Sequence, residues 1–194
     1  GANYINTSRL PEALDDYLKA LPYFERTLDS NKMAGTYSNI GGVYSYQGKN
    51  EKALEYFLKA LKINRVISPG SNFEVANLGN IAIIYHDKDD FTTALKYTLE
   101  ALQLCEKNHH LDMLPNATVS VGTIYSELNE NKKAYEYASR ALELARADQN
   151  LNVCVNALAV KGHAIKNMVE AGQQENLTVI LGDKKSQALA IARS

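Results

Sequence analysis

The sequence predicts an all-α protein, a right-handed superhelix (solenoid) built from antiparallel helix pairs. Alanines recur at positions 13, 53, 94 and 134, which are 40, 41 and 40 residues apart. Each interval holds two amphipathic stretches with apolar residues three and four positions apart, the spacing of one helix face. A fixed period of about 20 to 50 residues indicates stacked structural repeats. No stretch of the chain carries a convincing strand pattern.

The clearest copy covers residues 37–61, where two helices are joined by a turn at 48–50. Its key positions are a small residue, a tyrosine three residues later, an alanine nine further on and an Ala-Leu pair seven beyond that. In this copy they are Gly41, Tyr44, Ala53, Ala60 and Leu61. The next two copies have Ala82, Tyr85, Ala94, Ala101, Leu102 and then Gly122, Tyr125, Ala134, Ala141, Leu142. A partial copy holds Ala13, Tyr17, Ala20 and Leu21.

This spacing resembles the tetratricopeptide repeat in a lengthened form, over residues 1–148. The resemblance implies an antiparallel helix pair in each repeat and a concave surface that holds a peptide or a protein. The sequence departs from the family at two places. The tryptophan of the first helix is replaced by Tyr37, Leu78 and Thr118, and the proline after the second helix by Arg65, Glu106 and Arg146. Repeats of this length resemble those of bacterial signalling proteins.

We expect one domain over residues 1–194, organised as a stack of repeats. A partial repeat at 1–30 precedes repeats at 31–70, 71–110 and 111–149, and a degenerate or truncated repeat follows at 150–194. Terminal repeats often depart from the pattern because they cap the stack. The chain has no initiating Met and Gly1 falls inside a repeat, so we also expect it to be a fragment of a longer protein.

The individual elements follow from caps, breakers and apolar spacing. Residues 1–7 are expected to end a first helix, and Pro11 suits the first turn of the next, where its missing N–H costs nothing. Pro22 should kink or end that helix, with residues 23–30 as a separate turn or helix. Further helices are predicted at 31–47, 51–66, 72–87, 90–109, 112–128, 131–147, 151–169 and 184–193, with a loop at 68–71. Asp90 is expected to cap the helix beginning at 91.

Gly41 and Gly42 lie in the middle of a predicted helix, where glycine costs about 1 kcal/mol relative to alanine. Close approach of the partner helix would explain a glycine there, since a side chain at Gly41 would hold the two backbones apart. The two cysteines lie in different repeats, so we expect unbridged thiols, Cys105 and Cys154, which weakly favour the cytosol.

Composition and motifs give little sign of chemistry. The net charge of −1 gives no general attraction to nucleic acid, and no apolar run reaches the length of about 20 residues that a membrane span requires. Cys105, His109, His110 and Asp112 could suggest a metal site, but a structural zinc ion needs about four convergent ligands. The acidic run at 87–90 lacks the glycine and the distal glutamate of a calcium loop. We expect no cofactor, no metal and no catalytic residues.

The predicted binding surface is the face of each first helix that the repeat core does not use. In the register of the repeats this face includes Ser38, Asn39, Ser45 and Tyr46, then Asn80, Ile83, His86 and Asp87, then Asn116, Ser120, Thr123 and Glu127, and finally His163, Lys166 and Asn167. Asn39 and Asn80 occupy equivalent positions, and a carboxamide can pair with both the N–H and the C=O of an extended peptide. Alternatively, these asparagines could bridge neighbouring helices or simply face water.

The family's clamp for a C-terminal carboxylate needs basic residues beside such asparagines. The corresponding positions here include Asp87 and Glu127 instead, so a neutral or basic ligand fits better. The sequence therefore predicts a non-catalytic module for a protein or peptide ligand, or for another domain of its own chain. Two alternatives stay open. One is a homo-oligomerisation scaffold in which apolar residues 177–181 dock a second copy, and the less favoured one is an enzyme-associated domain.

Overall fold

The computed structural model describes residues 10–173, and every secondary-structure element in this range is an α-helix. Eight helices follow one another through these residues, and they divide into two compact units, Gly1–His110 and Leu111–Ser194. The first unit contains α1 (Leu10–Arg26), α2 (Ser30–Tyr46), α3 (Asn50–Ile67), α4 (Asn72–Asp87) and α5 (Phe91–Lys107). The second contains α6 (Leu114–Glu127), α7 (Asn131–Ala147) and α8 (Leu151–Glu170). No helix among the described residues is apolar over a stretch long enough to span a bilayer.

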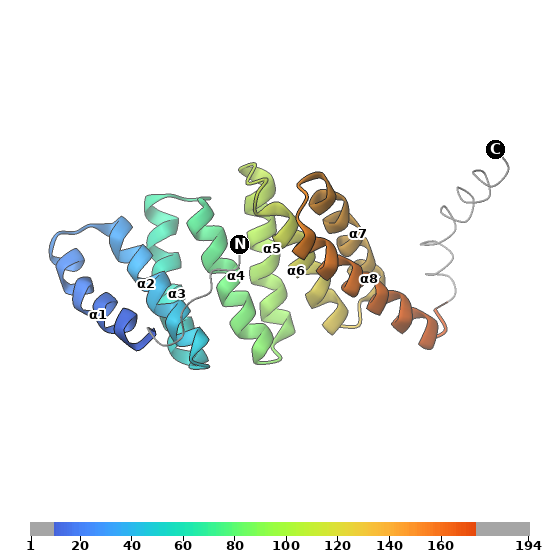
Figure 1. Cartoon of the computed structure of the whole chain (residues 1–194), viewed down its shortest axis with the longest axis horizontal. Helices are drawn as coiled ribbons and strands as arrows, with labels where there is room; N and C mark the ends of the chain where they lie inside the picture. Colours follow the sequence, from blue (N-terminus) through green and yellow to red (C-terminus); the bar gives the residue numbers. More distant parts are fainter. Residues whose placement is uncertain (1–9, 174–194) are drawn as a thin grey trace. The chain divides into compact units, whose positions relative to one another are not determined.

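In the first unit each helix packs on the next, as Figure 1 shows for α1 to α5. The pairs α2–α3 and α4–α5 are the helix pairs that the sequence predicted, and α2 also contacts α4. The core is formed by large apolar side chains that are almost completely buried, namely Ile40, Phe57, Leu61, Leu78 and Ile81. The repeat alanines Ala53 and Ala94 are fully buried, because a small side chain lets the paired helices approach.

In the second unit α6, α7 and α8 all contact one another. Two clusters of buried residues hold them together. One joins Val119 of α6 to Ala141 and Leu142 of α7 and to Val153 and Ala157 of α8. The other packs Ala134 and Tyr135 of α7 against Ala164 and Met168 of α8. The all-helical, paired architecture is thus confirmed in both units.

Each complete repeat also has a pair of stacked tyrosines between its two helices. The ring centroids are 5.6 Å apart for Tyr44–Tyr56, 5.6 Å for Tyr85–Tyr97 and 5.5 Å for Tyr125–Tyr137. Such aromatic pairs contribute about 0.5–1.5 kcal/mol beyond the area they bury. Six of the chain's 12 tyrosines therefore serve packing between the two helices of a repeat.

The turns inside the repeats share one geometry. The residue two positions after the last helical residue has a positive φ: Gly48 (70°), Asp89 (57°) and Asn129 (59°). The following N–H then bonds back to a carbonyl of the preceding helix, as Lys49 N does to Tyr44 O at 2.9 Å. This αL ending satisfies carbonyls that the helix leaves unpaired. Asp90 caps α5 as expected, since its side chain accepts from Thr93 N at 3.0 Å.

Several sequence predictions need correction. Pro22 does not end a helix, because α1 continues through it to Arg26; the loss of one backbone donor is tolerated where the last turn is secured by the bonds Thr27 N to Tyr23 O and Asp29 N to Phe24 O. The helix predicted from 112 begins at Leu114. The predicted elements at 1–7 and 184–193 lie outside the described residues. Cys105 is buried, Cys154 is half-buried, and neither forms a disulfide.

Candidate functional site

The open face of the first unit consists of the exposed sides of α2 and α4. On each helix it follows the spacing i, i+4, i+7 and i+11, which keeps residues on one side. We define it by Gly35, Asn39, Gly42 and Tyr46 on α2 and by Ala76, Asn80, Ile83 and Asp87 on α4. The two helices are joined directly, since Ser38 Oγ donates to Asn77 Oδ1 at 2.9 Å. Ser38, one of the residues predicted to contact a ligand, therefore bridges neighbouring repeats.

Asn39 and Asn80 lie at equivalent positions of this face. Asn39 is exposed and Asn80 is half-buried. Within residues 10–173 neither carboxamide has a hydrogen-bond partner, whereas Asn77 next to them is bonded to Ser38 and to Phe73 O. Two carboxamides with unused donors and acceptors are thus presented by two helices that lie side by side.

Two of the positions on the α2 part of this face are glycines, so no side chain projects from the helix there. A Cβ at Gly35 or Gly42 would have no neighbouring atom within 4 Å, and neither residue has a positive φ. Neither packing nor backbone conformation therefore requires glycine there, although each costs about 1 kcal/mol in a helix. Gly41 differs, because a Cβ there would lie 2.8 Å from Phe57 Cδ1. Helix packing thus explains Gly41, and it leaves Gly42 unexplained.

The remaining residues flank the two asparagines. Tyr46 and Ile83 are each 56% exposed, and Asp87 is exposed at the end of α4. His86 points partly inward. Its ring packs edge-on against Phe91, Nδ1 lies 3.7 Å from Asp87 Oδ1, and Nε2 is buried without a partner in the described residues. His86 therefore contributes little of its polar surface to the open face.

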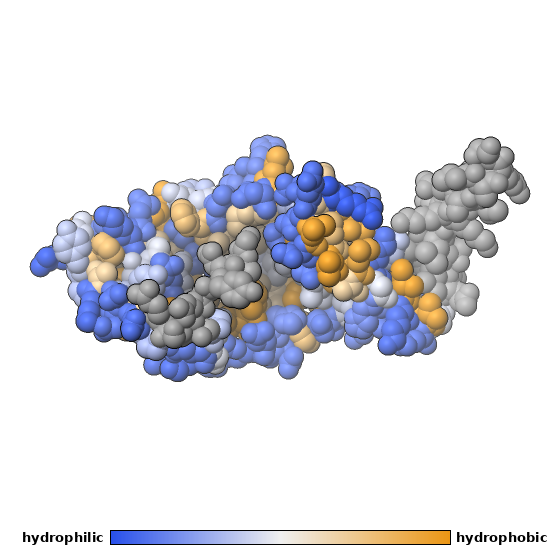
Figure 2. Space-filling model, viewed as in Figure 1, coloured by the Kyte–Doolittle hydropathy of each residue, from blue (hydrophilic) through white to orange (hydrophobic). Residues whose placement is uncertain are grey.

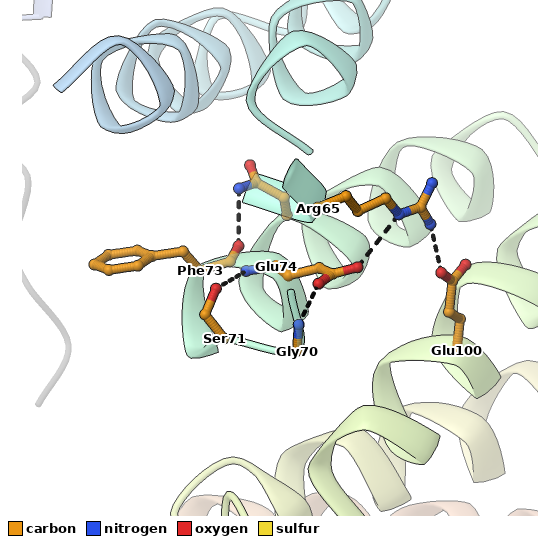
Figure 3. Close-up of polar contacts among 7 residues, drawn as sticks. Arg65, Gly70, Ser71, Phe73, Glu74 and Glu100 are labelled. Carbon is orange, nitrogen blue, oxygen red and sulfur yellow. Dashed lines mark hydrogen bonds and ion pairs between the residues drawn. The ribbon is translucent and has the colours of Figure 1, made fainter. Parts of the chain in front are cut away.

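A polar network fixes the start of α4 and so positions Asn80 (Figure 3). Ser71 caps the helix by accepting from Glu74 N at 3.4 Å, and the buried Glu74 carboxylate accepts from Gly70 N at 2.6 Å. Arg65 of α3 donates to Glu74 at 3.3 Å and also pairs with Glu100 of α5. Burial lowers the pKa of Arg65, but Glu100 and Glu74 outweigh it and the net shift is upward. The Ser71-x-x-Glu74 spacing is that of a capping box, a signal that sequence analysis missed.

Gly70 lies in the loop between α3 and α4, which connects two repeats, and three neighbouring groups surround it. Besides its N–H bond to Glu74, its carbonyl oxygen lies 2.6 Å from His110 Nε2, and its φ is +75°. A Cβ at this position would come within 2.6 Å of Asn108 Nδ2. His110, considered above as a metal ligand, therefore has a structural role. No group of three or more potential metal-binding side chains assembles within residues 10–173.

In the second unit the corresponding face of α6 carries Asn116, Ser120, Thr123 and Glu127. The hydroxyls are already used, because Ser120 Oγ donates to Asn116 O at 2.9 Å and Thr123 Oγ1 to Val119 O at 3.1 Å. On α8, His163 lies 3.3 Å from Ser126 of α6, and Asn167 donates to Asn131 of α7 at 3.2 Å. These residues join helices within the unit, while Asn116 and Glu127 are exposed.

The profile of the tetratricopeptide repeat family matches residues 1–65 and 73–147. The chain belongs to this family. Over 112 residues it is 30% identical to the photosystem I assembly protein Ycf3 of Rippkaea orientalis (strain PCC 8801 / RF-1), a match that covers 50% of this chain and 59% of that protein. This tetratricopeptide repeat chain thus spans less than two thirds of the length of that relative.

Solved structures share the fold at lower identity. The apo form of RapI superposes with a TM-score of 0.76 at 23% identity, covering 91% of this chain and 48% of RapI. A Rap protein complexed with Competence and Sporulation Factor gives a TM-score of 0.64 at 20% identity, covering 89% of this chain and 53% of that protein. These likenesses confirm the helical repeat fold, and the family is generally one of protein-binding modules.

Proposed function

We propose that the protein is a non-catalytic binding module whose open face on α2 and α4 holds an extended segment of another polypeptide. The observation that carries this proposal is the pair Asn39 and Asn80. Their carboxamides stand at the same repeat position on adjacent helices, and both are without a partner in the described residues. Unused polar groups on a rigid scaffold are typical of binding surfaces.

The chemistry of the face fits a peptide main chain. Each carboxamide can donate to a peptide C=O and accept from a peptide N–H, which gives recognition that depends little on the ligand's sequence. Gly35 and Gly42 have no side chain beside Asn39, so a main chain can lie close to α2 at these two positions. Tyr46 and Ile83 supply apolar contacts, and the exposed Asp87 favours a neutral or basic ligand over an acidic one.

We further propose that the module serves as the sensor or regulatory region of a larger protein. The matched relatives are longer than this chain, which supports a module within a larger architecture. A Rap protein that shares this fold is known in complex with Competence and Sporulation Factor, which supports a binding role for the module.

The test combines peptide selection with paired substitutions. Peptides selected from a random displayed library on the wild-type protein are measured against N39A/N80A by fluorescence anisotropy. Loss of two or more hydrogen bonds, each worth about 0.5–1.5 kcal/mol, should weaken binding about tenfold or more. The melting temperature should stay nearly unchanged, since neither side chain bonds to the protein. The control N152A removes another exposed asparagine, on α8, and should change neither quantity.

Two results would count against the proposal. If the selected peptides bind N39A/N80A as tightly as the wild type, the open face is not their site. If the double variant melts far below the wild type, the asparagines are structural and the peptide measurements do not isolate contact.

A further inference from the structure

A second surface, separate from the open face, runs along α8. Its residues recur at i, i+4, i+7, i+11, i+14 and i+18, and we define this apolar stripe as Leu151, Val155, Leu158, Gly162, Ile165 and Val169. Leu151 is 77% exposed, Val155 65%, Leu158 52% and Val169 59%. Figure 2 shows hydrophobic residues gathered on the surface along α8. Alternating steps of three and four residues are the pattern of a helix that packs lengthwise against another helix.

The other first helices show what normally covers this stripe. On α2 the equivalent positions include Ala34, Gly41 and Tyr44, which are buried, and α3 packs against them. On α4 they include Val75, Leu78 and Ala82, also buried, and α5 packs there. In α8 a Cβ at Gly162, the equivalent of Gly41, would meet no atom within 4 Å. The stripe therefore has the form of a first helix whose second helix is missing from the described residues.

The turn after α8 resembles the turns inside the complete repeats. Gly172 has φ +64°, as Gly48 has +70°. Gln173 N bonds to Met168 O at 2.9 Å, as Lys49 N bonds to Tyr44 O at 2.9 Å. After α2, α4 and α6 this turn leads at once into the second helix of the pair, at Asn50, Phe91 and Asn131. The turn at 171–173 thus has the geometry of the turns that connect the two helices of each complete pair.

We propose that residues 174–194 of the same chain dock on the apolar stripe of α8 as an antiparallel second helix and complete a fourth repeat. These 21 residues exceed the length of the second helices α3, α5 and α7, which have 18, 17 and 17 residues. Their sequence places apolar residues at the spacing of one helix face, namely Leu177, Leu181, Ala188 and Ile191.

A tethered segment also has the energetic advantage over a second copy of the protein. A stable dimer buries about 800 Å² on each partner, more than one helical stripe offers, and association costs several kcal/mol of translational and rotational freedom. A segment joined by a short turn is present at an effective concentration in the millimolar range or above. The apolar contacts of one helical stripe therefore suffice to hold a segment of the same chain, although they would not hold a second copy.

The full chain tests this by hydrogen exchange and a matched pair of variants. In the wild type, amides within 174–194 should exchange at least tenfold more slowly than in an unstructured peptide. L158D places a charge in the stripe and should lower the melting temperature by roughly 5 °C and speed exchange in 174–194. N156D adds the same charge on another exposed side of α8 and should leave both unchanged. Light scattering should show a monomer for all three proteins.

Three outcomes would overturn the proposal. Exchange in 174–194 at the unprotected rate in the wild type would show that the segment does not dock. A wild-type dimer that L158D converts to a monomer would assign the stripe to a second copy of the chain. Equal effects of L158D and N156D would mean that charge on α8, rather than loss of the stripe, causes the change. None of these outcomes bears on peptide binding at Asn39 and Asn80, so the two proposals fail independently.

Discussion

Gly41 in the first unit and Gly122 in the second hold the same place in the repeat, yet they meet different neighbours. Gly41 lies under the ring of Phe57, whereas Gly122 faces the backbone of α7, with a Cβ-to-Ala138 N distance of 3.3 Å. Phe57 and Ala138 are themselves equivalent positions, and both are buried. One repeat uses the absence of a side chain to seat an aromatic ring, and the other uses it to bring two helix backbones together.

The largest expected effect comes from filling the space above Phe57. In G41V the new Cβ would lie 2.8–2.9 Å from the ring atoms, and overpacking of a core typically costs about 1–3 kcal/mol. We expect a clear loss of unfolding free energy in urea. Combining G41V with F57L should recover part of it, because the obstacle is a side chain. Shortening a neighbouring side chain should not recover the stability of G122V to the same extent, because the obstacle there includes backbone atoms. An equal recovery of stability would contradict the distinction between the two glycines.

The connections between repeats allow the next comparison. Gly70 in the first unit and Gln149 in the second both have positive φ, +75° and +54°. G70A should destabilise by about 1–2 kcal/mol from the left-handed conformation alone, and more because its Cβ meets Asn108. Q149G should be neutral or slightly stabilising, since it removes that strain. Urea titrations of both variants measure this. A loss of only about 1–2 kcal/mol in G70A would mean that Asn108 moves aside, and a harmless G70A would contradict the strain itself.

A smaller effect of opposite sign is expected next to Gly41. G42A introduces a Cβ into open space, so the higher helix propensity of alanine should stabilise the protein by up to about 1 kcal/mol. The same change adds a methyl group to the surface of α2 beside Asn39. It should therefore weaken the binding of peptides selected on the open face. Stability and binding would then change in opposite directions, as measured by thermal melting and anisotropy. G42A with unaltered binding would show that the main chain of the ligand does not approach α2 there.

The smallest effect concerns pH and the helix caps. In the first unit Asp29 caps α2 and Asp90 caps α5, whereas in the second unit the amide Asn150 caps α8. Hydrogen bonds from Lys32, chiefly from its N–H, lower the pKa of Asp29, and those from the Thr93 hydroxyl and N–H lower that of Asp90. A folded-state pKa below the unfolded value gives stability that is complete above the unfolded pKa, near 4, and disappears as the pH falls through the folded value.

Hydrogen exchange between pH 5 and pH 3 should therefore show α2 and α5 losing protection at their first turns. The first turn of α8 should keep its protection relative to them. D29N/D90N should remove the difference while retaining both caps, because asparagine accepts the same bonds without titrating. Equal loss in all three helices would show that the caps do not set this pH dependence.

The sequence predicted the helix pairs well because their determinants are local and repeated. The period of about 40 residues, the buried alanines and the Gly48 turn each constrain a short segment, so predicted bounds such as 72–87 agree with α4 to the residue. The separate segment predicted at 23–30 was wrong, because α1 continues through Pro22 to Arg26 with its last turn secured by backbone bonds; a kink at Pro22 stays a prediction. Ser71 and Glu74 were missed although their spacing carries the signal.

The candidate site was harder to predict. The repeat register tells which side of a helix a residue lies on, but it does not tell which hydrogen-bond partners its side chain has. The asparagines at 39, 77 and 80 look alike in the sequence, but within the described part of the chain only the Asn77 side chain is bonded, to Ser38 of α2 and to Phe73 O of its own helix. Ser120 and Thr123 lie on the expected side of α6, and their hydroxyls turn back to their own backbone. Which polar groups stay available is decided by distances between neighbouring helices, and these emerge only from the packed structure.

The stacked tyrosines give the molecule a built-in optical readout. The chain contains no tryptophan, so near-ultraviolet circular dichroism and intrinsic fluorescence come from tyrosine without a stronger chromophore to mask them. Each complete repeat holds its own pair of rings less than 6 Å apart. Changing one pair at a time to phenylalanine would remove the signal of that pair, and the difference spectra would report the melting of the helix pair around it without an added label.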